Sequence, residues 1–178
     1  MNTFKPGDVI LMRSEETGLY RKLKDWLLGS PWGHVAIFFD TTKRGLPLVI
    51  ESIGRGVMIR ALNASEGRYV LVLRHEDEGK ALDAARQAEH LADNPDSWYD
   101  FWSIPRYVLP RLIWYKIAGR RHSFGYSHNP HFICSELADG AYGGIIPEEL
   151  MPPLPGDFLQ VKELHRYWEG ELKLRLRN

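Results

Sequence analysis

One thiol in this sequence has the surroundings that nucleophilic catalysis needs. Cys134, the single cysteine of the chain, lies in the segment FICSELADGAY, which has the pattern of a helix. Asn129, a good N-cap, and Pro130, a residue favoured at the first helical position, precede it, so we expect a helix to begin just before or at the cysteine. A helix start carries partial positive charge and free amide donors, which favour a thiolate and a developing oxyanion. The alternative is a buried small hydrophobe, since the cysteine shares one helical face with apolar residues.

A thiol nucleophile needs a base, and the base needs a group that orients it. His34 opens the apolar run HVAIFF, and Glu51 lies inside the next run, VIES. If the two runs form a hairpin with Thr41 to Arg44 as its loop, His34 falls directly opposite Glu51 on one face of the sheet. The carboxylate can then fix one imidazole nitrogen and leave the other for the thiol. The alternative is that both residues lie on a solvated face of the strands.

A metal site is the rival interpretation of the same region. His128, His131 and Cys134 are spaced three residues apart, and His122 lies close to them. Zinc sites usually take their ligands in pairs, and this chain has no second cysteine. We therefore expect neither a metal nor another cofactor.

The apolar patterning predicts an α+β fold in which an antiparallel sheet or barrel packs against helices. Alternating or continuous apolar runs predict strands at 9–12, 34–39, 46–53, 56–62 and 69–74, and an edge strand in the alternating tail 171–177. Helical spacing predicts helices at 19–27, 76–93 and 132–142, and at 99–118 a helical segment that Pro105 and Pro110 divide or kink. Residues 119–130 are expected to form a polar loop.

Composition limits the classes of protein. The 178 residues are expected to form a single domain over 1–178. Lys plus Arg equals Asp plus Glu at 23 each, which argues against nucleic acid as a partner because phosphate binding needs a basic surplus. One cysteine forms no internal disulfide, and the sequence shows neither a signal peptide nor a membrane span. These features predict a cytoplasmic protein and leave its oligomeric state open.

Four segments together carry a resemblance to a known family. In chain order they are GDVIL, WGHVAIFF, VIESIGRGV and FICSELADGAY. They resemble the circularly permuted papain-like branch of the NlpC-type cysteine hydrolases, above all its YiiX-like group, with lecithin:retinol acyltransferases as distant relatives. The resemblance implies a permuted papain-like fold with Cys134 as nucleophile at a helix start, His34 as base and Glu51 as the residue that orients the histidine.

Three functions are compatible with this resemblance. The first is a hydrolase that cleaves an amide or peptide bond, cell-wall peptides included, through a thioester; its partner is a peptide or small-molecule substrate. The second is a lipid-directed acyltransferase or thioesterase, and the third is a non-catalytic binding module. The intact Cys134, His34 and Glu51 favour an enzyme over the module.

One further segment bears on partners. Residues 101–121 contain five basic residues and no acidic one, among Trp and Tyr. This composition suits a helix at the surface of an anionic membrane or a lid over an apolar site. The simpler interpretation, which we favour from sequence, is a helix pair packed in the protein with its basic residues toward solvent.

Overall fold

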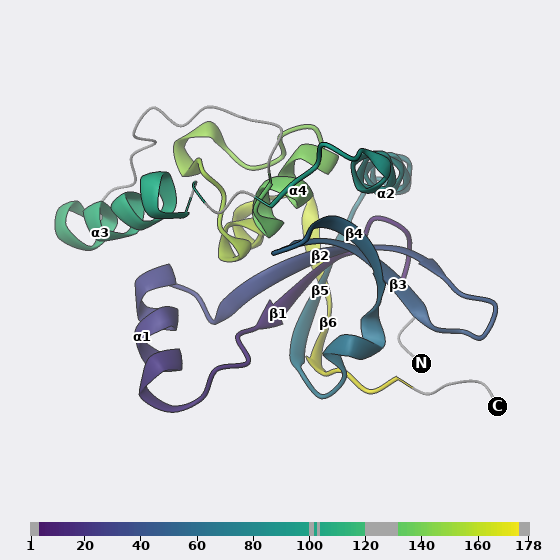
Figure 1. Cartoon of the computed structure of the whole chain (residues 1–178), viewed down its shortest axis with the longest axis horizontal. Helices are drawn as coiled ribbons and strands as arrows, with labels where there is room; N and C mark the ends of the chain where they lie inside the picture. The colour runs from purple at the N-terminus through teal and green to yellow at the C-terminus, as the bar shows by residue number, and fades with distance from the viewer. Residues whose placement is uncertain (1–3, 100–101, 103, 120–131, 175–178) are drawn as a thin grey trace.

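The computed structural model describes residues 4–99, 102, 104–119 and 132–174. Its strands form one antiparallel sheet with the order β4-β3-β2-β1-β5-β6 (Figure 1). The α+β architecture predicted from the apolar patterns is therefore confirmed. The strands are β1 (Val9–Arg13), β2 (Trp32–Thr41), β3 (Pro47–Ile53), β4 (Gly56–Ala61), β5 (Tyr69–His75) and β6 (Leu164–Glu171).

Four α-helices of the described residues divide into two groups (Figure 1). Two of them, α2 (Glu78–Asp93) and α4 (Cys134–Ala141), pack against one face of the sheet. The other two, α1 (Gly18–Leu28) and α3 (Leu109–Ala118), lie together beside one end of the sheet. As Pro105 and Pro110 predicted, the helical segment is divided: a short π-helical turn precedes α3. None of the helices in the described ranges is long and apolar enough to cross a bilayer.

Both faces of the central strands are buried, which explains the continuous apolar run of β1. Val9 and Leu11 pack in the cluster that includes Leu137 of α4, while Ile10 and Met12 pack in a second cluster on the other face. A strand buried on both faces has no polar alternation to show in its sequence. α4 thus packs against a sheet whose central strands are buried on both faces.

The register between β2 and β3 differs from the prediction. The observed pairs are Ile37 with Ile50 and Thr41 with Pro47, and the register shifts between Phe38 and Asp40. The connecting loop is longer than predicted because it closes on Thr42, whose Oγ1 accepts a hydrogen bond from the Leu46 N–H at 3.0 Å. At the pair Ile37–Ile50, which is nearest to His34 and Glu51, the register is displaced by two residues from the predicted hairpin. An even displacement keeps each side chain on the same face of the sheet.

The last strand lies earlier in the chain than its pattern predicted. β6 ends at Glu171, and Leu172 to Leu174 follow without strand structure, while the end of the predicted tail lies outside the described residues. Most side chains of β6 are exposed, since it is an edge strand paired only with β5. Its sequence therefore carries no apolar alternation that could have indicated it. The polar loop predicted at 119–130 lies, except for Gly119, outside the described residues.

Candidate active site

Cys134 is the first residue of α4, as the sequence predicted. The helix start is capped from within, because the buried Glu136 carboxylate accepts a hydrogen bond from the Ile133 N–H at 2.7 Å. The cysteine itself is only 9% exposed. Asn129 and Pro130, which the sequence suggested as the helix start, lie outside the described residues.

Two serines fix the start of α4 to neighbouring segments. The Ser52 hydroxyl, on β3, donates a hydrogen bond to the Phe132 carbonyl at 2.6 Å, two residues before the cysteine. The Ser135 hydroxyl donates to the Pro153 carbonyl at 2.7 Å. Both serines are buried, and neither was predicted from the sequence. They act as positioning residues that hold the thiol at a fixed place beside the sheet.

We expect Ser52→Ala to destabilise the protein by about 0.5–1.5 kcal/mol, because the Phe132 carbonyl loses its hydroxyl donor. Denaturant unfolding measures this difference. Ser97→Ala is the matched control, since the Ser97 hydroxyl is also buried but makes no hydrogen bond within the described residues. Equal losses of stability in the two variants would show that the Ser52 hydrogen bond contributes nothing.

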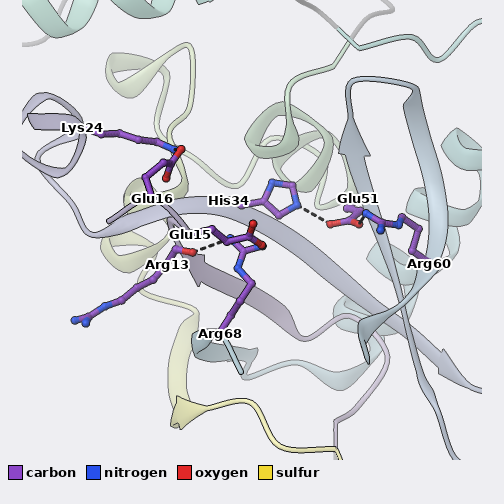
Figure 2. Close-up of polar contacts among 8 residues, drawn as sticks. All are labelled: Arg13, Glu15, Glu16, Lys24, His34, Glu51, Arg60 and Arg68. Carbon is purple, nitrogen blue, oxygen red and sulfur yellow. Dashed lines mark hydrogen bonds and ion pairs between the residues drawn. The ribbon is translucent and has the colours of Figure 1, made fainter. Parts of the chain in front are cut away.

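His34 and Glu51 are joined by a direct hydrogen bond, and Arg60 completes the group (Figure 2). His34 Nε2 lies 2.6 Å from Glu51 Oε2, and Arg60 Nη1 donates to Glu51 Oε1 at 2.8 Å. A carboxylate has no proton to give, so Nε2 must carry the hydrogen and donate it. This leaves Nδ1 as the free nitrogen of the neutral ring. The predicted contact between His34 and Glu51 is thus present, whereas its register was wrong.

The Glu51 carboxylate is ionised although it is buried. Burial alone would raise the pKa of Glu51, but the hydrogen bonds and positive charges of His34 and Arg60 outweigh it and hold that pKa below its ordinary value. Arg60 was not predicted from the sequence. It pairs with Val49, so it lies on the face of Glu51 one diagonal step away.

The thiol and the imidazole favour each other's charged form. Burial raises the pKa of Cys134, yet the charge and hydrogen bond of His34 outweigh this effect, and the net shift is downward. Burial likewise lowers the pKa of His34, but contact with Cys134 and then Glu51 raises it to about 9. Between these two pKa values the pair is a thiolate and an imidazolium.

Two backbone amides add to this stabilisation. The N–H groups of Val35 and Ser135 donate hydrogen bonds to the sulfur and lower the pKa of Cys134 further. Val35 lies on β2 beyond Ile37, where the pairing of β2 with β3 ends. Because β3 no longer pairs with β2 at this position, the thiol of Cys134 can lie next to the Val35 backbone.

A polar cavity of about 320 Å³ opens beside the His34–Glu51 pair. Charged side chains of both signs line it, including Glu16, Lys24 and Arg68 (Figure 2). Lys24 pairs with Glu16 at 2.9 Å. The cavity thus offers a polar surface next to the imidazole.

The rival metal site is only partly within the described residues. Three of its candidates, His122, His128 and His131, lie outside them. Among the residues that the structure describes, no group of three or more His, Cys, Asp or Glu side chains could hold a metal ion. Cys134 contacts His34 instead.

Comparison with known proteins supports the fold. No family model and no curated protein matches this sequence. The crystal structure of the metalloprotein YiiX from Escherichia coli O157:H7, described as DUF1105, matches with a TM-score of 0.56 and 13% sequence identity. The match covers 94% of this chain and 98% of that one. This chain therefore has a YiiX-like fold along nearly its whole length.

Proposed function

We propose that this protein is a cysteine hydrolase of the permuted papain-like type, which cleaves an amide or peptide bond through a thioester. One observation carries the proposal: a thiol at a helix start contacts an imidazole whose other nitrogen is bound to a buried carboxylate. Nucleophile, base and orienting group thus form one connected chain. The resemblance of the four sequence segments to that superfamily supports the same roles.

The first half of the reaction forms the thioester. The Cys134 thiolate attacks the carbonyl carbon of the substrate, and the carbonyl oxygen becomes an oxyanion near the positive end of α4. The imidazolium of His34 then gives its Nδ1 proton to the leaving nitrogen, and the C–N bond breaks. An amine leaves, and the acyl group remains on the sulfur.

The second half releases the acid. Neutral His34 takes a proton from water, and the oxygen of that water attacks the thioester carbon. The C–S bond breaks, a carboxylic acid leaves and the thiolate–imidazolium pair is restored. Glu51 accepts the Nε2 hydrogen throughout, so it fixes the ring orientation and stabilises its charged form.

A lipid-directed acyltransferase or thioesterase is the second candidate. An exposed apolar surface on α1 and α3 favours it, because these helices pack against Ile133, the residue directly before the nucleophile. The chemistry at Cys134 is the same up to the thioester. Only the final acceptor, an alcohol or amine instead of water, differs between transfer and hydrolysis.

Acylation of the thiol tests the proposal. The protein is incubated with p-nitrophenyl acetate, a small activated ester, and its intact mass is followed over time. We expect a transient gain of one acetyl group on Cys134, located by peptide mapping, together with release of p-nitrophenol beyond the background rate. A stable adduct that never hydrolyses favours transfer to another acceptor. Absence of any adduct at Cys134 under native conditions contradicts a thiol enzyme.

A further inference from the structure

The apolar stripe of α1 faces solvent instead of the core. Leu19, Leu23 and Trp26 recur at helical spacing, yet they are 83%, 57% and 58% exposed. No residue of this helix is fully buried. An amphipathic helix normally places such a stripe against the protein, but in α1 more than half of each of these side chains is open to solvent.

A second exposed stripe lies on the neighbouring helix α3. Leu109, Ile113 and Ile117 are spaced four residues apart on one face, and Ile117 is 77% exposed. The opposite face of α3 is packed, because Leu112 belongs to a cluster that includes Leu27 of α1. The two helices thus lie side by side at the end of the molecule away from α2 (Figure 1). We call these two stripes together the α1–α3 face.

Basic side chains outnumber acidic ones on α1 and α3, and two of them, Lys22 and Lys116, lie beside the apolar stripe of α1. Arg21, Lys22 and Arg106 are exposed, and the Lys116 ammonium lies 4.7 Å from the centroid of the Trp26 ring, which connects α3 to α1. Asp25 is the only acidic residue in 18–28 and 104–119. Apolar and aromatic side chains with basic residues beside them match the composition of surfaces that lie in a bilayer interface.

We infer that the α1–α3 face docks on anionic phospholipid membranes. The apolar stripes enter the boundary between headgroups and acyl chains, and the basic residues contact the anionic headgroups. A second copy of the chain is a poor occupant, because a two-fold contact would place the same basic residues against each other. Docking does not depend on the chemistry at Cys134.

Docking would place the candidate active site close to the lipid surface. The packed side of α3 meets Ile133, the residue before Cys134, through Leu112. Lys24 of α1 lines the cavity beside His34. The same two helices therefore connect the exposed face with the site.

Vesicle co-sedimentation of the full chain tests the inference. Vesicles of phosphatidylcholine alone are compared with vesicles that contain phosphatidylcholine and phosphatidylglycerol. We expect the protein to pellet with the anionic vesicles at low salt, and much less with the neutral ones. Replacing both Lys22, which flanks the stripe of α1, and Lys116, which lies on the Trp26 ring, by Gln should weaken binding at least about tenfold, since each basic residue near an anionic surface contributes about fivefold.

Substitutions of the apolar residues themselves test the same face, because each introduced carboxylate removes an apolar contact and is repelled by the anionic headgroups. Leu23→Glu and Ile117→Glu should each abolish pelleting, whereas the control Leu82→Glu, at an exposed leucine of α2, should leave it unchanged. Cys134→Ala should bind vesicles like the parent chain, so failure of the proposed chemistry leaves this result intact. Wild-type protein that stays in solution with anionic vesicles at low salt overturns the inference. A dimer that Leu23→Glu dissociates also overturns it, because a second copy is then the occupant.

Discussion

Cys134→Ala is expected to abolish acyl turnover, because the chain contains no second thiol that could form the thioester. His34→Ala should lower kcat/KM by about 10²–10⁴-fold, the contribution of a positioned general acid–base group. The structure gives the reason: Nδ1 of His34 is the nitrogen left free to take and return the thiol proton. Hydrolysis of p-nitrophenyl acetate, or of any amide substrate found for the protein, measures both losses.

Residues that act as one unit lose activity non-additively. The double variant His34→Ala, Cys134→Ala should therefore be no less active than Cys134→Ala alone. His165→Ala is the matched control, since His165 is exposed on β6 and lies outside the site. Near wild-type turnover by Cys134→Ala would remove the thiol from the mechanism, and loss of activity with a chelator would then point to a metal.

Glu51→Gln is expected to lower kcat/KM by about 10–10²-fold, less than His34→Ala, because loss of a neighbouring negative charge lowers an imidazole pKa by about one to two units while the ring keeps a hydrogen-bond acceptor. The amide oxygen of Gln can still accept the Nε2 hydrogen. Its NH₂ group must then face Arg60, which can move because its side chain is 39% exposed. The lost negative charge no longer stabilises the imidazolium, so the pKa of His34 falls and less thiolate is present at neutral pH.

Two control variants separate this effect from general destabilisation. Arg60→Gln should cost less than Glu51→Gln, since Arg60 acts on the imidazole only through the carboxylate. Glu169→Gln alters an exposed ion pair with Arg166 and should leave kcat/KM unchanged. If Glu51→Gln retains full activity and an unchanged pH profile, Glu51 has no orienting role.

The contact between His34 and Glu51 could be predicted from the sequence, whereas the register of the two strands that carry them could not. The spacing of two apolar runs indicated neighbouring antiparallel strands, which the structure confirms. The register was wrong because the longer loop that closes on Thr42 displaces the pairing beside it by three residues, and the bulge between Phe38 and Asp40 reduces this displacement to two. Neither feature leaves a periodic signal in the sequence. His34 and Glu51 still lie on the same face of the sheet because the register near them is displaced by an even number of residues.

Arg60 could have been found from the sequence. Gly54 and Arg55 form a two-residue connection between β3 and β4, with Ile53 paired to Gly56. Gly56, directly after these two residues, has a positive φ of 107°, and a glycine in this conformation is typical of a short hairpin connection, which fixes the register of both strands. That register places Arg60 opposite Val49, hence on the face of Glu51.

Other features depend on tertiary contacts that a single sequence does not encode locally. The Ser52 hydroxyl meets a carbonyl eighty residues away in the chain. The apolar stripe of α1 has the same pattern as a packed helix, so only the structure shows that it is exposed. The catalytic roles of Cys134, His34 and Glu51 stay predictions until activity is measured.

The pH dependence of Cys134 alkylation tests the central claim, the thiolate–imidazolium pair, most directly. The rate of reaction with iodoacetamide follows the thiolate fraction. Because His34 lowers the pKa of Cys134, the wild-type rate should already be high near neutral pH, below the ordinary thiol pKa of about 8.5. His34→Ala removes that stabilisation, so its rate should be low at neutral pH and rise only near or above the ordinary value. Two superimposable profiles, both with midpoints near about 8.5, would contradict the pair and with it the proposed mechanism.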